Sequence, residues 1–284
     1  MLTVREKLPE FWDLATTIAS DLQSQIIVAR ETLRERIKPL LEPDWVESMD
    51  QVIPGWRQIA TINDGETALH TLLVCAACFN LPEYTRLAER TRHEIEWAAL
   101  LHDLDKQLAR QDSAHPFRSA AVAARLLPSL GFQPRAQIRA AQIAAWSQLV
   151  MAAQRPDRAR MVHDHSRLPE IIAGLHACWG PDSSAVRILK AILFHQSLPT
   201  LNAWPNAVLL SDAELAYALS RADLQVLGPL MLADSDSWNM FTQHRQPYLQ
   251  EIRANNAATR RRMRALDAAV LPMPGSGGKE HGRI

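Results

Sequence analysis

Glycine, cysteine and long hydrophobic runs are all scarce in this chain of 284 residues. Only 10 residues are glycine, whereas alanine, leucine, arginine and glutamine are abundant, and this composition favours helix. No segment approaches the roughly 18 consecutive apolar residues that a membrane-spanning helix needs. The charged N-terminus is not followed by the apolar stretch of a signal peptide. We therefore expect a soluble, cytoplasmic, all-α protein with no membrane partner.

The chain has three cysteines, too few and odd in number for a disulfide framework, which indicates a reducing compartment. Cys75 and Cys78 form a Cys-x-x-Cys motif inside an apolar run, without the second cysteine pair of a zinc site. We expect both to be small, packed helix residues. The formal net charge is zero, so a large basic surface for nucleic acid is not indicated.

Apolar residues recur at intervals of three and four along much of the chain, which predicts a succession of helices. No strand-like alternation is found, and residues 155–168 are expected to form an exposed loop. The chain divides into a helical cap or arm (1–60), a metal-binding helical domain (61–235), a polar, arginine-rich C-terminal helix (236–271) and a disordered tail (272–284).

The most informative stretch is Glu-Trp-Ala-Ala-Leu-Leu-His-Asp-Leu-Asp-Lys, residues 96–106, in which an apolar helical segment runs directly into His102 and Asp103. A buried charge costs several kcal/mol unless it is paired or bound to a metal. An ordinary core helix has no reason to place an imidazole and a carboxylate there. Asp103 and Lys106 are three residues apart and share a helix face.

Three further side chains of the same kind, those of His70, His195 and Asp223, lie in largely apolar helical stretches. One buried histidine is usually a hydrogen-bonded core residue, but several on separate helices indicate a shared metal site. Imidazoles combined with carboxylates suit Mn, Fe, Co, Ni or Zn better than an all-oxygen Mg site. For the last metal ligand we prefer Asp223, because it stands in an Arg-Ala-Asp setting within a helix. Asp212, Asp234 and Asp236 are the competing candidates for that ligand.

The order of a histidine, a His-Asp doublet and a distant aspartate resembles the HD-domain superfamily of metal-dependent phosphohydrolases. The matching segments are residues 66–71, 98–106 and 221–223, and the resemblance covers roughly residues 64–230. It implies an HD-domain-like helical bundle with extra N- and C-terminal helices.

Residue roles follow from this resemblance by position. The implied metal ligands are His70, His102, Asp103 and Asp223. The implied catalytic residues are Asp103 and Lys106, and the implied substrate-binding residues are Lys106, His115, Arg118 and His195. One divalent transition metal is expected. The two histidines at 115 and 195 leave open whether a second ion also binds.

The implied function is hydrolysis of a phosphomonoester or phosphodiester, in a nucleotide or related phosphate ester, by a metal-activated water. One alternative is a non-catalytic metal- or nucleotide-binding sensor or scaffold, suggested by the helices outside the matched region. The other is a di-iron oxygenase of the same fold. The expected partner is a small phosphorylated molecule, and the sequence leaves open whether the chain forms a homo-oligomer.

Overall fold

A computed structural model describes residues 2–27, 30–106, 114–157, 160–198, 210–239 and 246–269. Over these ranges the chain is all-α apart from one short hairpin, which confirms the predicted fold class. The tail predicted at 272–284 lies outside the described residues. No helix in the described ranges combines the length and the apolar character needed to cross a membrane.

The N-terminal part is built from short helices that follow the spacing of its apolar residues. They are α1 (Val4–Lys7), α2 (Pro9–Gln23), α3 (Arg30–Ile37), α4 (Pro43–Val52) and α5 (Trp56–Thr61), with 3-10 turns at Lys38–Leu41 and Ile62–Gly65. Proline opens α2 and α4 at a position where its missing N–H is not needed. The rings of Phe11 and Trp56 meet edge to face, 5.7 Å apart, and tie α2 to α5.

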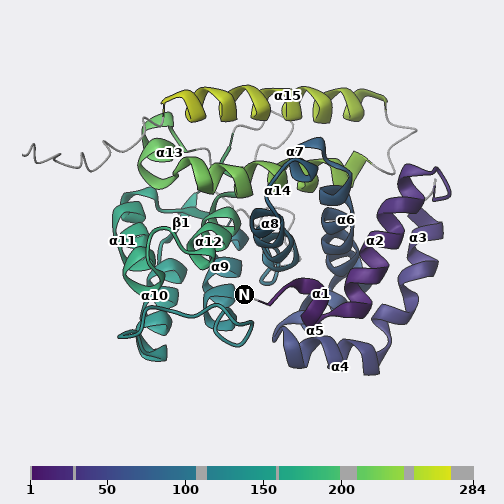
Figure 1. Cartoon of the computed structure of the whole chain (residues 1–284), viewed down its shortest axis with the longest axis horizontal. Coiled ribbons are helices and arrows are strands. Elements are labelled where there is room, and N and C mark those ends of the chain that lie inside the picture. The colour runs from purple at the N-terminus through teal and green to yellow at the C-terminus, as the bar shows by residue number, and fades with distance from the viewer. Residues whose placement is uncertain are drawn as a thin grey trace, which may run out of the picture.

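Five helices form the centre of the molecule: α6 (Glu66–Asn80), α8 (Glu89–Leu101), α9 (His115–Leu126), α12 (Ser184–Phe194) and α14 (Arg221–Asn239). In Figure 1, α14 runs across the ends of α6, α8 and α12, and it packs against all three. The N-terminal helices α2 and α5 cover α6 on one side. Because α6 is enclosed, residues 67–78 are all buried, which explains their nearly continuous apolar run.

Cys75 and Cys78 lie in the enclosed part of α6, as predicted for packed helix residues. Neither forms a disulfide, and both side chains are at most 5% exposed. Burial raises the pKa of both thiols. The two cysteines therefore stay protonated and belong to the core.

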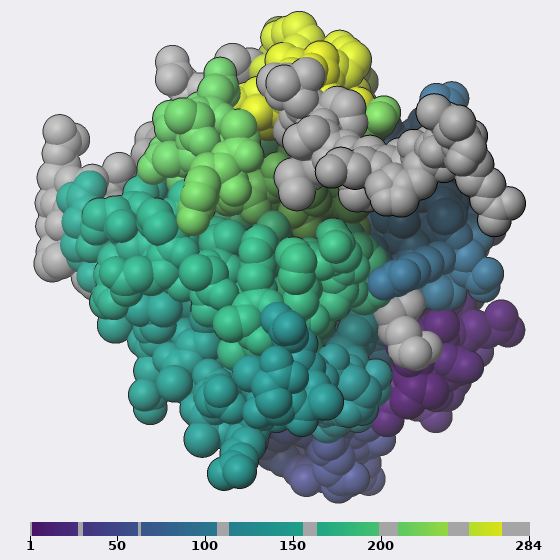
Figure 2. All heavy atoms as spheres, turned by 60° about the vertical axis from the view of Figure 1, so that its left-hand side comes forward, coloured from purple at the N-terminus to yellow at the C-terminus, as the bar shows by residue number. Residues whose placement is uncertain are grey.

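The remaining elements cover the outside of this centre. They are α7 (Pro82–Thr85), α10 (Ala140–Ala152), β1 (Gln154–Asp157), β2 (Arg160–His163), a 3-10 turn (His165–Arg167), α11 (Leu168–Trp179), α13 (Asp212–Ala218) and α15 (Gln246–Ala269). Figure 2 shows α9 to α12, in teal and green, between α15 at the top and the N-terminal helices at the bottom. The exposed loop predicted at 155–168 is wrong in part, because β1 and β2 form an antiparallel hairpin there. Strands of four residues are too short to show a convincing alternation.

The polar, arginine-rich helix predicted at the C-terminal end corresponds to α15 in the described residues. Residues 236–239 still belong to α14, and α15 starts at Gln246 and lies along α14 (Figure 1). Its arginines are partly used in ion pairs, since Arg260 bonds Glu83 and Arg262 bonds Asp212. These pairs fasten α15 to α7 and α13.

Candidate metal centre

Five buried side chains from four helices converge at the centre of the molecule. His70 lies in α6, and His102 and Asp103 come directly after α8. His115 is the first residue of α9, and His195 directly follows α12. None of the five is more than 6% exposed. The structure therefore brings together five of the side chains singled out in the sequence.

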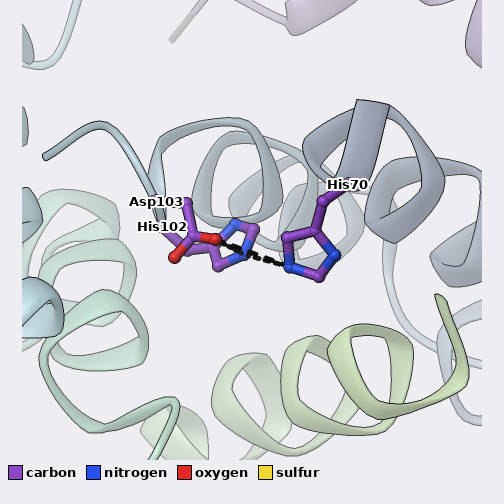
Figure 3. A group of neighbouring side chains, drawn as sticks. All are labelled: His70, His102 and Asp103. Atoms are coloured by element: carbon purple, nitrogen blue, oxygen red, sulfur yellow. Dashed lines mark hydrogen bonds and ion pairs between the residues drawn. The ribbon is translucent and has the colours of Figure 1, made fainter. Parts of the chain in front are cut away.

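His70, His102 and Asp103 form a first group with regular geometry (Figure 3). The two imidazole Nε2 atoms are 3.5 Å apart, and Asp103 Oδ2 lies 3.5 Å from each of them. A point equidistant from the corners of such a triangle is about 2.0 Å from each corner, which is the length of a Zn–N bond. This group could hold a metal ion.

Hydrogen bonds on the far side of each ring orient the imidazoles of this group. His102 Nδ1 donates to the carbonyl of Ala99 at 2.7 Å. His70 Nδ1 lies 3.2 Å from Ser237 Oγ, which itself donates to the carbonyl of Asp234 and so accepts from the ring. The neutral rings therefore carry their proton on Nδ1 and turn the Nε2 lone pair into the site, the arrangement of metal-bound histidines.

The other oxygen of Asp103 faces a second group. Oδ1 lies 3.0 Å from His115 Nε2 and 3.9 Å from His195 Nε2, and these two nitrogens are 3.2 Å apart. His195 Nδ1 donates to the carbonyl of Ile192 at 2.8 Å, and Gln196 Nε2 lies 3.3 Å from His115 Nε2. This group could also hold a metal ion, and Asp103 is shared by both groups.

Burial and neighbouring charges set the protonation of the cluster. Burial lowers the pKa of His102, and burial together with the two nearby imidazoles lowers the pKa of His195 to about 3. Burial alone would raise the pKa of Asp103, but His102, Lys106 and His115 hold it well below its usual value. At neutral pH these two imidazoles are uncharged and the carboxylate is ionised, as metal ligands must be.

The aspartate of α14 that contacts the cluster is Asp234. Its Oδ1 lies 3.1 Å from His70 Nε2. Burial opposes ionisation of Asp234, but the neighbouring imidazoles, His70 first, keep its pKa below the usual value. Asp223, the ligand preferred from the sequence, lies eleven residues earlier on the same helix, about 16 Å away along its axis. The structure therefore does not bring Asp223 to the cluster, and the described aspartate of α14 that contacts His70 is Asp234.

Asp223 has another role that explains its burial. Its Oδ2 accepts hydrogen bonds from Lys190 Nζ and from the backbone N–H of Ser220, both at 2.8 Å. Ser220 Oγ accepts in return from the N–H of Asp223 at 3.2 Å, which makes the pair a capping box at the start of α14. The Ser-x-x-Asp spacing was the sequence signal for this role. No sequence signal identified Ser237.

Lys106 and Arg118 both contact the turn that begins with Asp103. Lys106 Nζ donates to Asp103 Oδ2 at 2.6 Å, and its side chain is 29% exposed. Arg118 Nη2 donates to the carbonyl of Asp105 at 2.9 Å. The side chain of Asp234 is 22% exposed. Lys106 and Asp234 are therefore more exposed to solvent than the clustered side chains that they contact.

No family model, no curated protein and no solved structure matches this chain. The likeness to the HD-domain superfamily therefore rests on the motif residues alone and stays a prediction.

Proposed function

We propose that the protein is a metal-dependent phosphohydrolase that acts on a nucleotide or related phosphate ester. The observation that supports this most strongly is the triangle of His70, His102 and Asp103, with edges of 3.5 Å. In the neutral rings both Nε2 atoms are acceptors, and they face a carboxylate oxygen that is also an acceptor. Three buried acceptors that converge on one point are stabilised by a cation among them.

A divalent ion in this triangle would supply a Lewis acid and an acidified water. His70, His102, Asp103 and Asp234 are the side chains that would hold it. Lys106 lies next to Asp103 and offers a positive charge to phosphoryl oxygens as negative charge develops on them.

The opposite side of the carboxylate suits either of two uses. His115 and His195 present Nε2 atoms there, 3.0 Å and 3.9 Å from Asp103 Oδ1. With Asp103 they would hold a second ion, or His115 would bind the substrate phosphate. His195 Nε2 can act only as an acceptor or metal ligand while its Nδ1–H donates to Ile192. Arg118 adds a second cationic side chain, besides Lys106, at the turn that follows Asp103. Two positive charges there favour an anionic substrate.

The test is the substitution Asp103→Ala. Because Asp103 belongs to both groups, this variant should lose bound metal and release no phosphate from a panel of nucleotides and simple phosphate esters. Metal per chain is measured by elemental analysis, and phosphate release by a colorimetric assay. Asp44→Asn, an exposed position on α4, is the control and should keep both properties. A folded Asp103→Ala variant with undiminished hydrolysis would contradict the proposal.

The burial of the cluster supports a second candidate, a structural or sensory metal site without turnover. All five clustered side chains are at most 6% exposed, which is also typical of a site that only binds. Tight nucleotide binding by the metal-loaded protein without phosphate release would favour this candidate. Two irons per chain combined with oxygen uptake would indicate a di-iron oxygenase instead.

A further inference from the structure

Asp105 connects the turn that carries the candidate ligands to α9. Its backbone N–H donates to Ser119 Oγ at 3.1 Å, and its carbonyl accepts from Arg118 Nη2 at 2.9 Å. Its carboxylate Oδ1 lies 3.5 Å from Arg118 Nε. All three contacts go to consecutive residues of one helix. The turn between Asp103 and Lys106 is therefore fastened to the first turns of α9.

The same part of α9 reaches the cluster directly. Arg118 comes three residues after His115, so the two side chains share one face of the helix. His115 Nε2 lies 3.0 Å from Asp103 Oδ1. The helix therefore meets the ligand turn at two points, through His115 on Asp103 and through Arg118 on Asp105. Arg118 therefore contacts the chain two residues after the candidate ligand Asp103.

The carboxylate and the backbone of Asp105 make different contributions. The backbone bond to Arg118 is short and does not depend on the side chain at position 105. The 3.5 Å contact of the carboxylate is long for a hydrogen bond, so it contributes mainly charge. The side chain of Arg118 is only 10% exposed, and a guanidinium that buried requires an opposite charge nearby. Removing the carboxylate would take away the charge that Asp105 places beside the guanidinium and weaken the hold of the turn on its direction.

We propose that Asp105 is a positioning residue for anion binding. Its carboxylate holds the Arg118 guanidinium beside the ligand turn, so that Arg118 and Lys106 present two positive charges to one phosphoryl group. Asp105 itself contacts neither the ion nor the phosphate. This inference rests on the proposed function, because it assigns the direction of a phosphate-binding side chain in that site.

The test is a double-mutant cycle in the full chain loaded with Mn²⁺, with inorganic phosphate as the probe and calorimetry as the measurement. Asp105→Asn keeps the shape and the backbone contacts but removes the charge. It should weaken phosphate binding about tenfold, the effect of one lost charge-assisted contact. Arg118→Gln should weaken it at least as much. The double variant should bind no worse than Arg118→Gln alone, because Asp105 acts through Arg118.

Two further measurements separate positioning from a general loss of structure. The Mn²⁺ affinity of Asp105→Asn should stay within about twofold of wild type, since the candidate ligands are intact. In the metal-free protein, solvent exchange of the Arg118 Nε–H, measured by NMR, should be faster in Asp105→Asn than in wild type. The exposed-site variant Asp44→Asn should match wild type in every measurement.

The outcomes distinguish this inference from the proposed function. If the Mn²⁺-loaded wild type binds phosphate but Asp105→Asn binds it equally well, the positioning role is overturned and the phosphohydrolase proposal stands. Additive losses in the double variant, or unchanged exchange at Arg118, also overturn it. If the Mn²⁺-loaded wild type binds no phosphate, the proposed function fails first and the positioning role fails with it.

Discussion

The two ends of α14 carry aspartates of the same chemistry in similar apolar surroundings, yet they do different things. Asp223 lies at the start of the helix, where it closes a capping box and pairs with Lys190. Asp234 lies three turns later and faces the imidazole of His70. The comparison shows that a buried carboxylate acquires its role from the partners that the fold supplies. Its position in a sequence pattern is a weaker guide.

The partners of the two carboxylates differ in exposure as well as in kind. Asp223 and Lys190 are 1% and 3% exposed, so they form an ion pair that is sealed within the protein. The side chain of Asp234 is 22% exposed, and His70 is 6% exposed. Removing one partner of such a sealed pair destabilises the fold, because the other charge stays buried. A carboxylate at the edge of the imidazole cluster is a candidate to bind an ion there, which the proposed function requires.

Removal of Asp223 should have the largest effect on stability. The substitution Asp223→Ala leaves the Lys190 ammonium buried without its partner, at a cost of about 3–5 kcal/mol in the free energy of unfolding. Urea denaturation of the metal-free protein measures this loss. The metal affinity of the fraction that remains folded should be unchanged.

A matched double variant tests the reason for that loss. Asp223→Leu combined with Lys190→Met replaces both charges with apolar groups of similar size and should regain much of the stability. If Asp223→Ala instead lost bound metal while the urea midpoint stayed at the wild-type value, Asp223 would be a ligand after all.

Removal of Asp234 should have the opposite effect, a loss of metal affinity with little change in the free energy of unfolding. Asp234→Ala should weaken metal binding by between about tenfold and a hundredfold, because His70 loses a neighbouring donor to the same ion. The free energy of unfolding of the metal-free protein should change by less than about 1 kcal/mol, since this carboxylate is at the edge of the cluster. Titration calorimetry and urea denaturation measure the two quantities. Unchanged metal affinity would remove Asp234 from the candidate ligands.

The sequence was sufficient to identify His70, the His102-Asp103 doublet and His195 as members of one buried cluster. Each of these residues interrupts an apolar helical run, and a buried imidazole or carboxylate needs a partner wherever the fold places it. The helical periodicity also predicted the all-α fold, because helices such as α2 are long enough to repeat the spacing of their apolar residues several times.

The sequence could not decide between Asp223 and Asp234. Both follow apolar residues on one helix, and the choice depends on which turn of α14 crosses α6. Tertiary packing alone sets that crossing point. Ser237 was missed for the same reason, since its hydroxyl gains its role only from the nearby Nδ1 of His70. The preference for Asp223 also overlooked the capping box with Ser220, a local explanation that needs no metal.

The stability of the protein should also depend on pH, and this dependence should come from the cluster near Asp234 rather than from the pair at Asp223. The group responsible is His195, which directly follows α12. In the folded protein the pKa of His195 is about 3, whereas an unfolded histidine titrates near about 6.5. Between these values the unfolded chain binds a proton that the folded protein does not. The free energy of unfolding therefore falls as the pH is lowered from about 6.5 toward 3, by up to about 1.4 kcal/mol per unit for His195 alone.

Urea denaturation of the metal-free protein at several pH values, with a chelator present, measures this slope. His195→Asn keeps a polar side chain but cannot titrate, so its slope should be shallower than that of wild type. Asp223→Asn changes the other end of α14 and leaves His195 in place, so it should retain the part of the slope that His195 contributes. Equal slopes in wild type and His195→Asn would mean that His195 is protonated in the folded metal-free protein. A charged ring would then occupy the place where the proposed site needs a neutral nitrogen donor.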